Sequence, residues 1–91
     1  MNNDWSQLKA QLTEHQSFPS VYMFKFILSS DNQKIAQIEA LFNNDSDAAI
    51  SVRNSSRGRY VSITVRQLVR SVEQIIDIYE RASDIPGVMM M

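Results

Sequence analysis

The sequence predicts one α+β domain, a ferredoxin-like βαββαβ sandwich preceded by a short N-terminal helix. The chain has 91 residues, of which 44% are hydrophobic and 21% charged, as expected for one globular core and too few for two. Its periodic segments follow the order helix, then β-α-β-β-α-β. Right-handed crossovers turn this order into a four-stranded antiparallel sheet with two helices on one face. We therefore assign residues 1–17 to an amphipathic helix and residues 18–91 to the ferredoxin-like domain.

The N-terminal helix is predicted by apolar residues at helical spacing. Trp5, Leu8 and Leu12 recur at positions i, i+3 and i+7. Asp4 stands where a capping side chain is expected. The helix should end before Phe18-Pro19, because proline disfavours helical backbone in the residue that precedes it.

A nearly unbroken apolar run, VYMFKFIL in residues 21–28, predicts a central strand. Alternation divides its side chains between two faces of the sheet. The bulkier, uncharged set is assigned to the core: Tyr22, Phe24, Phe26 and Leu28. The set that contains a lysine is assigned to an open face: Val21, Met23, Lys25 and Ile27.

The following segment predicts a helix of about three turns. Ser30 with Gln33 fits a capping box at its start. Apolar residues then recur at helical spacing: Ile35, Ile38, Leu41 and Phe42. The polar residues 43–47 are expected to end this helix, since their side chains bond their own backbone.

Two alternating segments, residues 48–54 and 59–66, predict a β-hairpin. The connection contains Gly58, which can adopt a positive φ. The apolar positions of the first strand are Ala48, Ile50 and Val52. The apolar positions of the second strand are Val61, Ile63 and Val65.

The C-terminal part of the chain predicts a longer amphipathic helix and a short strand. The apolar stripe of the helix consists of Leu68, Val72, Ile75, Ile76, Tyr79 and Ala82. Pro86-Gly87 ends the helix. Residues 88–91 are interpreted as a short strand at an edge of the sheet.

Two segments resemble the YbeD-like family of small, uncharacterised bacterial proteins. They are FP at residues 18–19 with YMFKF at 22–26, and SSRGRY at 55–60 with SITV at 62–65. The similarity continues through Glu73-Gln74 and Tyr79 and covers most of residues 18–91. It implies an ACT-like fold and a binding or regulatory role. The loop at residues 29–32 lacks the glycine that many amino-acid-binding ACT domains have there, which is a departure from their pattern.

The composition offers little material for catalysis or cofactor binding. Cysteine is absent and His15 is the sole histidine, so a metal site would need scattered carboxylates at no recognised ligand spacing. No GxSxG segment is present, and Ser55 and Ser56 are interpreted as turn residues. With glycine only at Gly58 and Gly87, no phosphate-binding loop is expected. We expect no enzyme, no metal and no cofactor.

The cellular setting is predicted to be the cytoplasm. The chain has no cysteine that could form disulfides. Residues 1–4 are polar and do not resemble a signal peptide. No apolar run approaches the roughly 18 residues of a membrane span, so no membrane partner is expected.

The arginines give the strongest indication of a binding surface. Five of them, and no acidic residue, lie between Asp47 and Glu73, so this segment has a charge of +5 while the rest of the chain has −6. The candidate ligand- or partner-binding residues are Lys25, Arg53, Arg57, Arg59, Tyr60 and Arg66. The alternative is that these arginines are solvated side chains that discourage pairing at the sheet edge.

Apolar residues on the predicted open face suggest that something covers it. These candidate interface residues are Val21, Met23 and Ile27. A protein partner, a second copy of the chain in a homodimer, or the N-terminal helix could each provide the cover.

The leading functional hypothesis is a non-enzymatic ACT-like regulatory module that binds a small anionic effector or a protein through the open face. A structural homo-oligomer is one alternative, and RNA binding is another. RNA readers of this fold place aromatics on both central strands, whereas Arg57-Gly58 is followed by Tyr60 at a different spacing. Nucleic acid is therefore not the expected partner.

Overall fold

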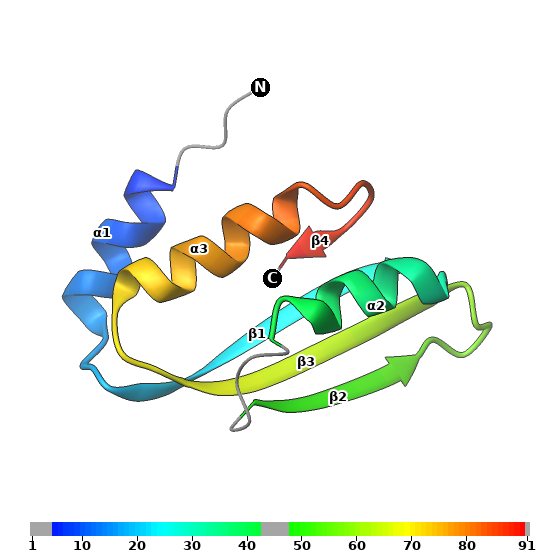
Figure 1. Ribbon diagram of the computed structural model, residues 1–91, viewed down its shortest axis with the longest axis horizontal. Helices are drawn as coiled ribbons and strands as arrows, with labels where there is room; N and C mark the ends of the chain where they lie inside the picture. The colour runs from blue at the N-terminus through cyan, green and yellow to red at the C-terminus, as the bar shows by residue number, and fades with distance from the viewer. Residues whose placement is uncertain (1–4, 43–47, 91) are drawn as a thin grey trace.

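The computed structural model describes residues 5–42 and 48–90 as a helical layer over one four-stranded antiparallel sheet (Figure 1). The elements are α1 (Ser6–His15), β1 (Ser20–Ser29), α2 (Asn32–Ala40), β2 (Ala49–Asn54), β3 (Tyr60–Val69), α3 (Val72–Ser83) and β4 (Met89–Met90). The strand order β2-β3-β1-β4 is that of a ferredoxin-like sheet, so the predicted fold class is confirmed. The cap at Asp4, the helix end in residues 43–47 and the strand residue Met91 lie outside the described residues.

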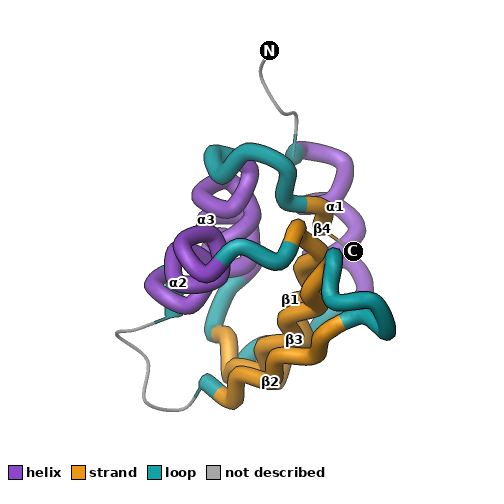
Figure 2. The backbone as a smooth tube through the Cα atoms, turned by 90° about the vertical axis from the view of Figure 1, so that its right-hand side faces the viewer, coloured by secondary structure: helices purple, strands orange, loops and turns teal. Residues whose placement is uncertain are grey.

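The helices lie over one face of the sheet, as Figure 2 shows, and the core lies between them and the two central strands. β1 and β3 pair antiparallel from Ser20↔Val69 to Ser29↔Tyr60. Their side chains toward the helices are almost fully buried: Phe24, Phe26, Leu28, Val61, Ile63, Val65 and Val69. The predicted core face of the first strand is therefore confirmed, with Tyr22 partly buried at its end.

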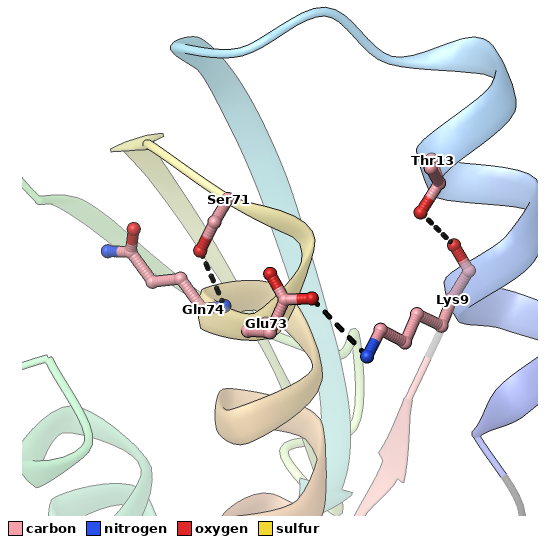
Figure 3. Close-up of polar contacts among 5 residues, drawn as sticks. All are labelled: Lys9, Thr13, Ser71, Glu73 and Gln74. Atoms are coloured by element: carbon pink, nitrogen blue, oxygen red, sulfur yellow. Dashed lines mark hydrogen bonds and ion pairs between the residues drawn. The ribbon is translucent and has the colours of Figure 1, made fainter.

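α3 supplies most of the helical side of the core. Its buried residues are Val72, Ile75, Ile76, Ile78, Tyr79 and Ala82. Ser71 precedes the first turn in extended backbone, and its side chain accepts a hydrogen bond of 3.3 Å from the backbone N–H of Gln74 (Figure 3). This cap satisfies one of the amide groups that a helix start leaves without a partner.

Replacing Ser71 with alanine is expected to lower the free energy of unfolding by about 1 kcal/mol, because the Gln74 N–H loses its acceptor. Urea denaturation followed by circular dichroism measures the change. Ser71→Asp is the matched control, since its carboxylate can accept the same hydrogen bond. Equal losses in the two variants would contradict the capping role.

α1 packs against α3 on the helical side of the sheet. Lys9 Nζ lies 3.3 Å from Glu73 Oε2 (Figure 3), and the rings of Trp5 and Tyr79 stack with centroids 5.9 Å apart. Leu12 is buried in the core. The idea that the N-terminal helix covers the open face is therefore wrong, because its apolar side chains serve the opposite side of the sheet.

The predicted capping box of the second helix is wrong by one residue. Asp31 is the N-cap of α2, and its Oδ1 accepts a hydrogen bond of 2.9 Å from the backbone N–H of Gln33. Ser30 lies directly after β1, and its N–H donates to the backbone oxygen of Arg59 at 2.9 Å. The side chain that accepts the first hydrogen bond of α2 is therefore that of Asp31 and not that of Ser30.

The second strand of the hairpin is longer than predicted. β3 continues through Gln67, Leu68 and Val69, and the last two pair with Val21 and Ser20 of β1. The assignment of Leu68 to the helical stripe is therefore wrong. Leu68 stands four residues before Val72, a helical spacing, but strand pairing with β1 decides its conformation.

β2 is an edge strand, and all of its residues are exposed. Ile50 and Val52 pair with Val65 and Ile63, whose side chains are buried on the helical side. Alternation therefore places Ile50 and Val52 on that same side, yet they remain 38% and 47% exposed. The helices thus cover the central strands and leave this edge uncovered.

Candidate functional site

The sheet surface that faces away from the helices is the candidate site, and we call it the open face. Strand register and alternation assign to it Val21, Met23, Lys25 and Ile27 of β1, Tyr60, Ser62, Thr64, Arg66 and Leu68 of β3, Ala49, Ser51 and Arg53 of β2, and Met89 of β4. The structure thus brings Lys25, Arg53 and Arg66 to one side of the sheet, where the alternation of the sequence predicts them.

The three cations are distributed across this face. Arg66 lies between Met23 on β1 and Ala49 on β2, whereas Lys25 stands opposite Thr64. Lys25 and Arg66 are therefore diagonal cross-strand neighbours, with backbones about 7–8 Å apart. Arg53 lies on the far side of β3, opposite Ser62. Such spacing suits several separate anionic groups better than one small anion.

Acidic side chains are absent from the open face in the part of the chain that the structure describes. The described acids lie in the helices or directly beside them: Glu14, Asp31, Glu39, Glu73, Asp77, Glu80 and Asp84. The fold therefore separates charge, with a basic sheet surface and an acidic helical surface. A field of this kind attracts and orients an oppositely charged partner.

Large apolar side chains share the open face with the cations. Val21 is 67% exposed, Met23 52% and Met89 57%, and Leu68 and Ile27 lie opposite Val21 and Met89. Exposed apolar groups rimmed by polar residues are typical of interaction surfaces. The sequence prediction missed Leu68 and Met89, although alternation beyond Arg66 would have found Leu68.

The open face has two hollows, and both are open to solvent. One, of about 480 Å³, lies near the β2–β3 turn and is lined by Ile27, Arg53, Tyr60 and Ser62 among others. The other, of about 260 Å³, is lined by Ala49, Ile50, Ser51, Thr64 and Arg66. Small-molecule sites usually enclose most of their ligand, and neither hollow does so.

The remaining predicted residues lie at the β2–β3 turn. Gly58 has φ +70°, and its N–H donates to the backbone oxygen of Ser55 at 3.0 Å, which confirms the predicted turn role of this glycine. Tyr60 lies on the open face and is 54% exposed. Arg57 is in the turn itself, and alternation from β3 points Arg59 away from Tyr60. The turn therefore separates these two arginines from the other cations.

A smaller hollow on the helical side, which we call the aromatic pocket, joins four elements. It measures about 210 Å³ and is lined by Trp5, which directly precedes α1, and by Leu8 of α1, Tyr22 of β1, Tyr79 of α3 and Met90 of β4. The Tyr22 and Tyr79 hydroxyl oxygens are hydrogen-bonded at 3.0 Å. Burial, and next the bond with Tyr22, raise the pKa of Tyr79 well above its ordinary value. The sequence assigned these side chains to separate helices and strands and gave no indication that they line one pocket.

The raised pKa of Tyr79 predicts that the fold loses stability in alkali. Above the ordinary pKa of 10.0, the unfolded chain releases the Tyr79 proton while the folded chain keeps it, so the free energy of unfolding falls as pH rises. Urea midpoints measured from about pH 9 to about pH 11 test this. The Tyr79→Phe variant cannot ionise there and should show a shallower decline, whereas an identical slope would contradict the prediction.

Other candidate chemistry finds no assembled site in residues 5–42 and 48–90. His15 lies exposed in the last turn of α1. No group of three or more side chains of the metal-binding types is gathered in these residues. Within the same ranges, no helix combines the length and apolar character needed to cross a membrane.

The chain is similar to a described family and to two individual proteins. Residues 13–91 match the family described as "Protein of unknown function (DUF493)". A UPF0250 protein from Shewanella piezotolerans is 30% identical over 83 residues, covering 89% of this chain and 94% of that relative. The structure of the uncharacterized protein TM1266 from Thermotoga maritima aligns with a TM-score of 0.65 at 16% identity, covering 78% of this chain and 90% of that chain. This structural likeness shows the fold alone.

Proposed function

This chain belongs to the DUF493 family, the YbeD-like proteins of unknown function, and we propose that it is a non-enzymatic module that binds another protein. The open face provides the binding surface. One observation carries the proposal: exposed apolar side chains lie among Lys25, Arg53 and Arg66 with no acidic residue of the described chain on that face. The complementary partner presents apolar side chains among carboxylates.

A protein partner fits this surface better than a small anionic effector. Lys25, Arg66 and Arg53 lie on three different strands, β1, β3 and β2. The hollows beside them are open to solvent. A small anion would contact one cation and remain largely hydrated. A protein surface can meet all of them and cover the apolar residues at the same time.

A second copy of the chain fits the open face less well than a different protein. In a two-fold dimer each face would meet an identical one, so Lys25, Arg53 and Arg66 would approach the same basic residues. Like charges brought together at an interface cost several kcal/mol. A homodimer through this face is therefore disfavoured.

RNA is also a weaker match than protein. Bases stack on exposed aromatics of both central strands in RNA readers of this fold. Here Tyr60 is an exposed aromatic of β3, but the aromatics of β1 point toward the helices: Tyr22, Phe24 and Phe26. The face therefore has cations for phosphate but lacks the paired stacking platform.

We expect the module to act by regulation, changing the activity of its partner when it binds. This expectation rests on the ACT-like fold, which is an analogy and not a chemical site. The absence of cysteine suits a reducing compartment, so the cytoplasm is the expected setting.

Site-specific photo-crosslinking in the native cell tests the proposal. A benzophenone amino acid replaces Met23 on the open face or, as the matched control, the exposed Glu80 on α3. We expect one defined protein to be crosslinked from position 23 and not from position 80. Crosslinking from position 80 alone, or equally from both positions, would show that the open face is not the binding surface.

A further inference from the structure

β1 has a free edge beside β4. β3 pairs with β1 along its whole length, whereas the described residues of β4, Met89 and Met90, pair with Ile27 and Phe26. Beyond this short pairing, residues 20–24 have no strand neighbour on that side in the part of the chain that the structure describes. An unpaired strand edge can accept an added strand through its backbone groups.

The backbone groups that face this edge can be assigned. Ser30 donates its N–H to the oxygen of Arg59, so the backbone of Ser30 faces β3. Antiparallel strands direct the backbone groups of successive residues to alternate sides, so the even-numbered residues of β1 face β3 and the odd-numbered ones face away. Val21 and Met23 therefore direct their N–H and C=O groups to the free edge. Among the described residues, no strand pairs with Val21 or Met23 on that side.

The aromatic pocket lies at the same edge, on the helical side. Tyr22, which lines it, stands between Val21 and Met23, and Met90 lines it from the end of β4. The side chains of an added strand alternate between the two faces of the sheet. One of them, placed beside Tyr22, would enter this pocket of about 210 Å³, which has room for an apolar side chain.

The open-face side of the edge favours acidic and apolar groups. Val21 and Met23 are well exposed there, and Met23 lies between Arg66 on β3 and the free edge. Lys25 follows two residues further along the same face. Side chains of an added strand that point to this face would meet these apolar surfaces and positive charges.

We propose that an extended segment of a partner protein adds to the free edge of β1, forming hydrogen bonds with Val21 and Met23. An apolar side chain of that segment fills the aromatic pocket, and acidic side chains on its other face lie near Lys25 and Arg66. This inference rests on the proposed function for the partner's class, and it specifies how that partner binds. The occupant is a separate chain with alternating apolar and acidic residues.

Selection from a displayed library of random heptapeptides provides the probe. Peptides are selected on the immobilised full chain, and the strongest binder is synthesised for measurement. We expect a consensus in which acidic and apolar residues alternate. In the complex, amide hydrogen exchange should slow at Val21 and Met23 and remain unchanged at Ile50 and Val52 on the opposite edge of the sheet.

A proline variant tests the backbone contact. The N–H of Val21 faces the free edge, so Val21→Pro leaves the β1–β3 ladder intact and removes a donor from the binding edge. We expect about a tenfold loss of affinity for the selected peptide. Ile50→Pro is the matched control, because alternation from the hydrogen bond of Ser55 with Tyr60 directs its N–H to the outer edge of β2. This control should bind with unchanged affinity.

Several results would overturn the edge proposal. They are failure of the library to yield a binder, unchanged exchange at Val21 and Met23, or full affinity in a folded Val21→Pro variant. If the Val21→Pro variant does not fold, amide hydrogen exchange of the unsubstituted chain with the selected peptide still tests the edge proposal. Protection of Val21 and Met23 without peptide, together with a dimer in sedimentation, would assign the edge to a second copy. If a protein is crosslinked from position 23 but the peptide experiments fail, the proposed function is supported and the edge proposal is wrong.

Discussion

Replacing Phe24 with alanine is expected to lower the free energy of unfolding by about 3–5 kcal/mol. The Phe24 side chain is fully buried at the centre of the sheet. Its ring packs against four others, with centroid distances from 4.9 to 6.4 Å: Tyr22, Phe26, Phe42 and Tyr79. These rings come from β1, α3 and the turn that follows α2, so the cavity left by truncation has walls from several elements and closes poorly. Domains of this size have little stability to spare, so partial unfolding at room temperature is expected.

Met23→Ala is the matched control for this core substitution. Met23 is the preceding residue of the same strand, and its side chain lies 52% exposed on the other face. Its truncation should change the free energy of unfolding by about 0.5 kcal/mol. Urea denaturation followed by far-ultraviolet circular dichroism measures both variants. A larger loss from Met23→Ala than from Phe24→Ala would mean that the two faces of β1 are assigned the wrong way round.

The double substitution Lys25→Glu with Arg66→Glu is expected to weaken binding of the crosslinked partner by about a hundredfold or more. The two side chains are cross-strand diagonal neighbours on the open face, so reversing both charges places two carboxylates against the partner's own. Both positions are exposed and have no ion-pair partner among the described residues, so the fold should persist. Isothermal titration calorimetry measures the affinity, and added salt should weaken the natural complex.

Arg57→Glu with Arg59→Glu is the control for charge reversal. It changes the net charge by the same amount, but at the β2–β3 turn instead of the open face. A general electrostatic attraction would be lost equally in both double variants. A specific contact with the open face predicts that the turn variant keeps most of the affinity. Equal weakening in the two would contradict the assignment of the site.

The strong periodic segments of the sequence were sufficient for the fold class and for the faces of the central strands. Phe24 and Phe26 alternate with Met23 and Lys25, and only one arrangement buries the rings and solvates the lysine. The family resemblance, carried by short segments across residues 18–91, is confirmed by the family match over residues 13–91. Regulation, absence of enzymatic activity and the cytoplasmic setting stay predictions.

The sequence predictions were wrong where the local sequence fits two structural assignments equally well. Leu68 suits both the helical stripe that continues to Val72 and the strand alternation that follows Arg66. Ser30 and Asp31 are both good helix caps, and the hydrogen bond from the Gln33 N–H to the Asp31 side chain shows which of them caps α2. For Leu68, pairing with a distant strand settled a choice that the local sequence left open.

The sequence by itself determined which residues of the first central strand face the core, because alternation depends on neighbours a few residues away. Only the tertiary structure decided that α1 packs on α3, that the described residues of β4 pair with Phe26 and Ile27, and that Trp5, Tyr22 and Tyr79 line one pocket. These features depend on contacts between segments far apart in the chain. No local period records such contacts, so the free edge and its pocket became visible only once the elements were packed together.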